Sequence, residues 1–408
     1  MTTPSPLALP ASNASPWPPL PPLETPVALL DTDTLDANLR RMQQRVQALG
    51  VALRPHVKTA KCVPVARRQQ ALGAQGITVS TLREADEFQA AGFADILYAV
   101  GITPHKVPHA LSLCERGCTL RVIVDSLAAA DAVVQAWQAW QGSPGAARAA
   151  ATGGRLGVLI EVDVDGERAG LLPDAPALLT IGQRLQAAGL LDGVMTHGGG
   201  SYGMRGEAAL QAFAEQERSR CVAAAERLRA AGLPCAVVSV GSTPTALSAA
   251  TAAGVTEVRA GVYAFFDLVM AGLGVCRPEH IALSVLTSVI GHQPDKGWVL
   301  VDAGWMALSR DRGTQNQAVD QGYGVVCDEH GTPVDGWWVQ AANQEHGIIT
   351  RRDGAAALTT HDVTQRFPLG SRLRILPNHA CATAAQFSAY RCISQGQLGE
   401  TWPRFGGW

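Results

Sequence analysis

The sequence has no run of basic residues and no marked excess of charge of either sign. Its 33 Lys and Arg side chains stand against 35 Asp and Glu, which gives a formal net charge of −2 at pH 7. Such a chain has no field that draws nucleic acid or an anionic membrane surface. We therefore expect no nucleic-acid partner.

Long apolar runs are also missing, although 47% of the residues are apolar. No uninterrupted stretch approaches the roughly 18 residues that a helix needs to span a bilayer. We therefore expect no membrane partner.

The nine cysteines are odd in number and scattered, without the dense spacing of a disulfide scaffold. They indicate reduced thiols and a cytoplasmic protein. The first 24 residues contain no Lys or Arg and many prolines, which argues against a signal peptide and predicts a mobile Pro-rich tail over residues 1–24.

What the sequence does contain is an alternation of β-branched runs with Ala/Leu/Arg/Gln segments of helical spacing, which predicts a parallel α/β sheet. No GxGxxG follows the first run, so an open doubly wound sheet fits less well than a (β/α)8 TIM-like barrel. The eight predicted strands are 26–30, 51–55, 76–80, 95–100, 120–125, 157–162, 193–197 and 236–240.

The pattern changes after residue 275 to strand-like runs with turn signals and little helical spacing. This predicts the barrel over residues 25–275 and a C-terminal β domain over residues 276–408. The Gly- and Ala-rich insert 141–154 is predicted to be a surface loop.

Lys58 follows the second predicted strand, in RPHVKT. A lysine at this position points into a barrel mouth, where its amine can react with a carbonyl group. The alternative is a solvated lysine in a polar loop.

The stretch that follows the eighth predicted strand, GSTPT, contains Gly241, Ser242 and Thr243. Small hydroxyl residues beside a glycine bring several donors to one point, which a bound phosphate needs. Gly261 and Tyr263 come shortly afterwards, and the tyrosine can donate to a phosphate oxygen. An ordinary capped turn and plain packing are the alternatives.

Two further strand ends carry candidate ligand-binding residues. THGGGSY contains His197 and Tyr202, which can lie close to a flat ligand, and Arg168 after the sixth strand can neutralise a phenolate oxygen. A hydrogen-bonded core histidine and a surface ion pair are the alternatives for His197 and Arg168.

His379 and Cys381 stand two positions apart in PNHACATA. On a strand these positions share a face, so an imidazole and a thiolate can reach one cation. Two protein ligands leave positions open, as in a catalytic metal site. A buried cysteine beside a chance histidine is the alternative.

Taken together, RPHVKT, THGGGSY, GSTPT and PNHACATA resemble motifs of the D-threonine aldolase and D-serine dehydratase family, pyridoxal 5'-phosphate (PLP) enzymes of the alanine-racemase fold. The resemblance covers nearly the whole chain from about residue 25. It implies that Lys58 binds the cofactor, that a divalent metal binds at the His-x-Cys pair, and that segments 309–313 and 343–347 lie near the substrate. It also places Arg168 and Tyr202 beside the pyridoxal ring and Ser242, Thr243, Gly261 and Tyr263 about the phosphate.

The resemblance implies a PLP- and metal-dependent dehydratase of a small D-3-hydroxy amino acid. The substrate would be D-threo-3-hydroxyaspartate, giving oxaloacetate and ammonia, or D-serine, giving pyruvate and ammonia. The metal would be zinc, with manganese or cobalt as alternatives, and the protein a homodimer.

Three other functions are compatible with parts of the pattern. D-threonine aldolase activity would use the same cofactor and metal to form glycine and acetaldehyde. A PLP-binding homeostasis protein has such a barrel but needs no β domain, and an alanine racemase has the β domain but no use for a metal.

Overall fold

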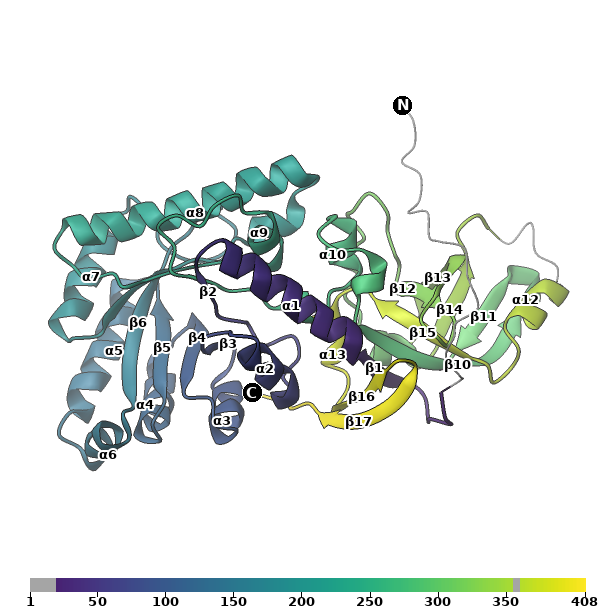
Figure 1. The fold of residues 1–408 in the computed structure, drawn as a ribbon, viewed down its shortest axis with the longest axis horizontal. Coiled ribbons are helices and arrows are strands. Elements are labelled where there is room, and N and C mark those ends of the chain that lie inside the picture. The colour runs from purple at the N-terminus through teal and green to yellow at the C-terminus, as the bar shows by residue number, and fades with distance from the viewer. Residues whose placement is uncertain (1–19, 355–359) are drawn as a thin grey trace. The chain divides into compact units, whose positions relative to one another are not determined.

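Two separate sheets organise the chain, one parallel and one mostly antiparallel (Figure 1). The computed structural model describes residues 20–354 and 360–408. Residues 39–263 and 407–408 form one compact unit, the barrel unit. The described part of residues 1–38 and 264–406 forms the other, the β unit.

Eight strands form the sheet of the barrel unit, and every neighbouring pair is parallel. The order is β2-β9-β8-β7-β6-β5-β4-β3. The bounds are β2 (Ala52–Leu53), β3 (Ile77–Val79), β4 (Asp95–Gly101), β5 (Thr119–Val124), β6 (Arg155–Glu161), β7 (Leu191–Met195), β8 (Val237–Val240) and β9 (Glu257–Val258).

The two edge strands of this sheet meet just beyond the end of β2. An isolated parallel bridge pairs His56 with Thr78, and the N–H of Val57 donates to the carbonyl of Thr78 at 2.9 Å. The sheet therefore curls until its edges join, and the predicted α/β barrel is confirmed.

Helices follow most of the strands, and several begin at a capping side chain. Thr81 accepts the N–H of Glu84 at 3.0 Å at the start of α3, and Ser143 caps α6. The bounds are α1 (Thr32–Ala48), α2 (Val63–Ala71), α3 (Leu82–Ala90), η1 (Pro104–Lys106), α4 (Val107–Glu115), α5 (Leu127–Trp140), α6 (Pro144–Thr152), α7 (Ala177–Ala187), η2 (Gly199–Gly203), α8 (Glu207–Ala230), α9 (Thr243–Ser248) and η3 (Val262–Ala264).

Two sequence predictions about the barrel unit are wrong. The insert 141–154 is a helix for most of its length, because Ser143-Pro144 is a start signal and the alanines that follow favour a helix. The first predicted strand, 26–30, pairs outside the barrel as β1 (Val27–Asp31), antiparallel to β10 and parallel to β16. The eighth barrel strand is instead β9, which was not among the predicted strands.

The β unit contains a nine-stranded sheet in the order β11-β14-β13-β12-β15-β10-β1-β16-β17. Its pairs are antiparallel except for β1 with β16. The strands after β1 are β10 (Leu283–Gln293), β11 (Trp298–Val301), β12 (Gly324–Cys327), β13 (Pro333–Ala342), β14 (Gly347–Arg351), β15 (Arg372–Pro377), β16 (Ala389–Ser394) and β17 (Gln397–Pro403). The helices are α10 (Leu268–Gly272), η4 (Pro278–His280), η5 (Pro294–Lys296), α11 (Trp305–Leu308), α12 (Thr360–Arg366) and α13 (Ala380–Ala384).

The end of the predicted N-terminal tail packs on this sheet. Residues 1–19 lie outside the described residues, but Leu20 is buried in a cluster with Leu29 and Leu286. The N–H of Leu20 also donates to Glu329 at 2.9 Å. Mobility predicted for residues 1–24 therefore does not extend to Leu20.

No helix within the described ranges is both long and apolar enough to cross a bilayer.

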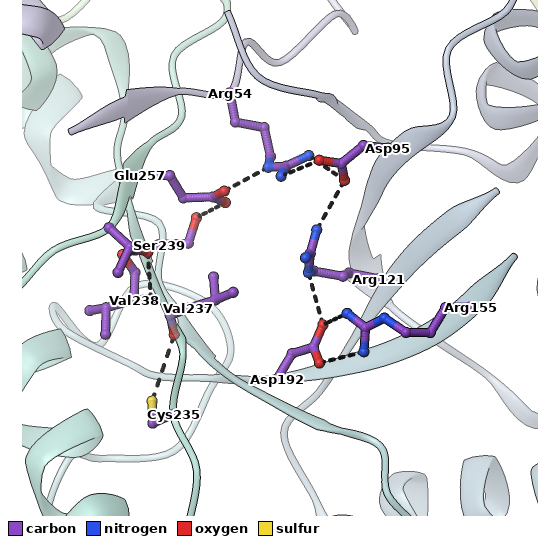
Figure 2. A network of polar contacts seen from close by, with 11 residues as sticks. Arg54, Asp95, Arg121, Arg155, Asp192, Cys235, Val237, Val238, Ser239 and Glu257 are labelled. Carbon is purple, nitrogen blue, oxygen red and sulfur yellow. Dashed lines mark hydrogen bonds and ion pairs between the residues drawn. The ribbon is translucent and has the colours of Figure 1, made fainter. Parts of the chain in front are cut away.

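A chain of ion pairs links strands of the barrel (Figure 2). Several of its members begin their strands, at the amino-terminal end that in such barrels serves stability. Arg54 contacts both Glu257 at 2.8 Å and Asp95 at 2.9 Å, and its side chain is only 5% exposed. The chain continues from Asp95 through Arg121, Asp192 and Arg155.

Replacing Arg54 by Met should lower the free energy of unfolding by about 3–5 kcal/mol, because the carboxylate of Glu257 would stay buried without its cation. Arg155→Met is the matched control, since its side chain is 45% exposed and its loss should cost less than about 1 kcal/mol. Denaturant unfolding monitored by circular dichroism measures both. Equal losses for the two variants would contradict a buried network.

Candidate active site

The carboxyl ends of parallel strands lie at one edge of a sheet, so the segments that follow them form one end of the barrel. Lys58 follows β2, Arg168 follows β6, His197 follows β7, and Ser242 follows β8. The structure therefore brings the predicted residues of the barrel unit to the same end.

Lys58 lies in a turn directly after the bridge that closes the barrel, and its side chain is exposed. A hydrogen bond closes this same turn: the N–H of Lys61 donates to the carbonyl of Val57 at 2.8 Å. Lys61 has a φ of 43°, which is unfavourable for a residue with a side chain. Its amine forms an ion pair with the buried carboxylate of Glu84 at 3.1 Å, which stabilises this backbone.

Two histidines near Lys58 are held neutral. The pKa of His197 is lowered to about 4, mainly by burial and also by the positive charges of Lys58 and Arg259, while a hydrogen bond to Gly241 acts in the opposite direction. Burial and the charge of Lys58 also lower the pKa of His56 well below its usual range. The Nδ1 of His197 lies 3.0 Å from the carbonyl oxygen of Gly241, so Nδ1 carries the proton.

Arg168 and His197 line the same cavity, which has a volume of about 230 Å³. The guanidinium of Arg168 is exposed and lies 3.6 Å from the carboxylate of Glu161. Burial raises the pKa of Glu161, and Arg168 opposes that rise. The Tyr202 side chain is 38% exposed.

The GSTPT segment is tightly packed. Ser242 caps α9 by accepting the N–H of Thr245 at 3.2 Å, and the Thr243 hydroxyl accepts the N–H of Tyr263 at 3.2 Å. Gly241 has a φ of 134°, and a Cβ there would lie 2.2 Å from the carbonyl oxygen of Arg259. Only glycine fits this close approach of two chains.

Gly261 and Tyr263 have different surroundings. A Cβ at Gly261 would lie 2.9 Å from the carbonyl oxygen of His56, so a glycine allows this contact. The Tyr263 side chain is 1% exposed, and its hydroxyl accepts a hydrogen bond from Gln69 at 2.9 Å. Its hydroxyl hydrogen can still be donated, so the phosphate contact of Tyr263 stays a prediction.

The sequence prediction named Gly261 and Tyr263 but not Arg259, which lies two residues before Gly261 and is 4% exposed. Its guanidinium donates to the Ser239 hydroxyl at 2.5 Å and to the carbonyl of Thr196. Burial lowers the pKa of Arg259, because the buried guanidinium loses its contact with water. A lone arginine among small and apolar residues after a strand was the available signal. Glu217 was also missed.

These residues fit PLP. The exposed amine of Lys58 suits the cofactor's carbonyl group, and the cation Arg168, which lines the cavity, suits an anionic oxygen.

In the β unit, His379 and Cys381 lie close together, but not on a strand as predicted. His379 follows β15 as the N-cap of α13, and Cys381 lies inside that helix. The short Ala-rich segment forms a helix because alanine favours one. The prediction of a shared strand face is therefore wrong, although the two side chains still interact.

Asp311, from the segment predicted to lie near the substrate, orients His379. Its carboxylate lies 2.5 Å from Nδ1 of the imidazole. Burial lowers the pKa of His379, but the hydrogen bonds with Asp311 and Cys381 raise it to about 11. The bond at Nδ1 leaves Nε2 for another ligand.

This donor set fits a divalent cation. An imidazole held by a carboxylate, beside a thiol, is a common arrangement at zinc. Within residues 20–354 and 360–408, no group of three or more His, Cys, Asp or Glu side chains is arranged to hold a metal ion. The pair would therefore supply two protein ligands.

The second predicted substrate segment, 343–347, comprises the turn between β13 and β14 and the first residue of β14. Within this turn the N–H of Asn343 donates to the carbonyl of His346 at 2.8 Å. Two arginines lie near Asp311 in sequence. Arg312 pairs with Asp320, whereas Arg310 lies over the ring of Trp305 at 5.2 Å.

Two family models match the chain. The model of the alanine racemase N-terminal domain matches residues 30–269, and that of a serine dehydratase domain matches residues 282–393.

Characterised proteins resemble the chain along nearly its whole length. D-threo-3-hydroxyaspartate dehydratase from Delftia sp. (strain HT23) is 58% identical over 95% of this chain and 98% of its own. D-serine dehydratase from Dictyostelium discoideum is 30% identical over 91% and 94%. D-threonine aldolase from Arthrobacter sp. is 30% identical over 97% and 96%.

The solved structure of the Delftia sp. HT23 dehydratase has a TM-score of 0.89 with this chain at 57% identity, covering 95% of this chain and 98% of that one. Another structure of D-threo-3-hydroxyaspartate dehydratase is a cysteine-to-alanine mutant in the metal-free form.

The neutral state of His197 can be observed directly. In ligand-free protein with ¹⁵N-labelled histidine, the ring should stay neutral with its proton on Nδ1 until the pH approaches about 4. Since an unfolded histidine takes up a proton near pH 6.5, this residue should lower the free energy of unfolding as the pH falls from about 6.5 to about 4.

Nuclear magnetic resonance of the ring nitrogens tests this, and the spectrum of His197→Gln assigns the signal. A His197 ring that is half protonated near pH 6.5, or that carries its proton on Nε2, would contradict the geometry.

Proposed function

Because the chain belongs to the family that joins an alanine racemase N-terminal domain to a serine dehydratase domain, we propose that it eliminates water from D-3-hydroxy amino acids. The first substrate is D-threo-3-hydroxyaspartate, giving oxaloacetate and ammonia, and the second is D-serine, giving pyruvate and ammonia. The observation that carries this proposal is the 58% identity with a D-threo-3-hydroxyaspartate dehydratase over 95% of the chain.

We propose that PLP binds at the carboxyl end of the barrel, with Lys58 as its covalent partner. When bound, PLP supplies an electron sink for the substrate's α-carbon. Arg168 and Tyr202 would lie beside the ring, while Ser242, Thr243, Gly261 and Tyr263 would hold the phosphate.

The chain's own groups then handle the proton. Lys58, as a free amine, would be the base that removes the α-proton of a D-substrate. His197 stays neutral beside it, because burial and the neighbouring cations oppose protonation. A neutral imidazole does not repel the ammonium form of Lys58 after the proton is taken.

We further propose a divalent metal at His379 and Cys381, with zinc preferred because of the thiolate and manganese or cobalt as alternatives. When bound, the metal supplies a Lewis acid for the 3-hydroxyl, a poor leaving group. Asp311 fixes the imidazole with Nε2 available. The metal-free form recorded for a cysteine mutant of the related dehydratase supports this proposal.

The protein acts in this proposal as a cytoplasmic homodimer.

Retro-aldol cleavage of D-threonine is the second candidate, favoured by the 30% identity with a D-threonine aldolase over 97% of the chain. It would use the same cofactor and metal, so the products decide between the two. A cofactor carrier would have no use for the β unit.

Purified protein given D-threo-3-hydroxyaspartate should release ammonia and a 2-oxo acid in equal amounts, and D-serine should do so more slowly. Lys58→Ala should lower turnover by at least about 1,000-fold, because covalent binding and proton removal are both lost. Enzymatic assays for oxaloacetate, pyruvate and ammonia measure this. If the protein formed glycine and acetaldehyde from D-threonine and released no ammonia from D-threo-3-hydroxyaspartate or D-serine, it would be an aldolase instead.

The metal proposal has its own test in Asp311→Ala. Losing the carboxylate that orients His379 should weaken metal binding about 10- to 100-fold, as measured by competition with a coloured chelator. Asp320→Ala is the control, since Asp320 pairs with Arg312. Full elimination activity after complete chelation would refute the metal's role.

A further inference from the structure

Glu217 is a buried carboxylate that contacts two of the loops at the candidate active site. It lies in α8 and is 2% exposed. Its Oε1 accepts the N–H of Gly198 at 2.7 Å and the N–H of Gly241 at 3.3 Å. These glycines follow β7 and β8, so one oxygen atom joins the backbones of both loops.

Placing this carboxylate in the interior is costly. Burial raises its pKa, while the hydroxyl of Thr245, the two backbone N–H groups and the charge of Arg259 lower it. An interior carboxylate that neutral donors satisfy is retained where its hydrogen bonds determine a conformation.

The surrounding sequence is adapted to this contact. A Cβ at Gly198 would lie 2.7 Å from Oε1 of Glu217 and 2.8 Å from the ring of Phe213. Phe213 and Glu217 are four positions apart in α8 and therefore lie on the same face of the helix. Gly198, the first glycine in THGGGSY, is thus required for the carboxylate of Glu217 to approach the backbone.

Other contacts join the same two loops. The Nδ1 of His197 binds the carbonyl of Gly241 at 3.0 Å, and the hydroxyls of Ser201 and Ser242 lie 2.9 Å apart. Side-chain and backbone hydrogen bonds therefore join the two loops, and the carboxylate of Glu217 adds a contact from α8.

We propose that Glu217 is a positioning residue: it holds the loop after β8, which contributes Ser242 and Thr243 to the phosphate site, at a fixed spacing from the loop after β7. This rests on the proposed function, in which that end of the barrel binds PLP. Glu217 acts through the two loop backbones and not by touching the cofactor.

The variants separate hydrogen bonding from charge and from size. Glu217→Leu has a similar shape but accepts no hydrogen bond, which leaves two N–H groups unsatisfied. Glu217→Gln keeps an oxygen acceptor and loses the charge. Asp192→Asn is the structural control, because Asp192 binds Arg121 and Arg155 in the ion-pair chain of the barrel.

The measurement is the rate at which holoenzyme loses PLP on dialysis, together with the preference for PLP over pyridoxal, which lacks the phosphate, when the cofactor is restored. Melting temperatures are recorded for every variant. Glu217→Leu should lower the preference for PLP about 10- to 100-fold, as expected for one or two lost hydrogen bonds. Glu217→Gln should stay within about threefold of wild type, and Asp192→Asn should lower the melting temperature without changing the preference.

Three results would overturn the inference. If Glu217→Leu kept the wild-type preference for PLP over pyridoxal, Glu217 would not position the loop that binds the phosphate. A Gln variant as impaired as the Leu variant would show that charge acts and not hydrogen bonding. If Asp192→Asn lost as much preference for PLP as Glu217→Leu does, the loss would reflect lower overall stability and not the position of the loops.

If Glu217→Leu does not fold, Gly198→Ala tests the same contact, since its methyl group displaces the carboxylate oxygen. It should lower the preference for PLP, and an unchanged preference refutes the inference. A different result tests the proposed function itself. If wild-type protein retains no PLP, the proposed function is wrong, and the inference about Glu217 falls with it.

Discussion

The closure of the parallel sheet is the constraint on which the barrel and its candidate site depend. An open sheet would leave unpaired N–H and C=O groups on β2 and β3. Closure occurs through Thr78, which donates to the carbonyl of Pro55 at 2.8 Å and accepts from Val57 at 2.9 Å. Lys58 is the next residue, so the hydrogen bonds that shut the barrel also fix the backbone that carries the reactive amine. The unfavourable φ of Lys61 is tolerated there because a buried ion pair holds it.

Charge is used differently at the two ends of the strands. In the ion-pair chain of Figure 2, arginines and carboxylates compensate one another and link several strands of the barrel. At the carboxyl ends, Arg259 and Glu217 are buried mainly among neutral donors and acceptors. Such groups contribute little net stability. Their placement behind the loops agrees with a role in shaping a binding site.

Much of the barrel was predictable, because alternation of strands and helices implies parallel pairing, and parallel pairing brings the segments with Lys58, His197 and Ser242 to one edge. The identity of the edge strands was not. The run that forms β1 is apolar and would suit either sheet. Its partners β10 and β16 lie far away in the sequence. Buried charges such as Glu217 were missed for the same reason, since their partners are backbone groups of distant loops. The His-x-Cys pair was recognised by chemistry, but a two-residue spacing does not determine whether a strand or a helix presents it.

The central claim is that Lys58 forms the covalent link to PLP, and borohydride reduction tests it most directly. Reduction of the holoenzyme converts that link into a stable bond, and mass spectrometry of the peptides then locates the added mass. The account predicts the label on Lys58 and none on the neighbouring Lys61. Two results would contradict it: an added mass on another lysine, or holoenzyme that contains PLP but shows no added mass on any peptide after reduction.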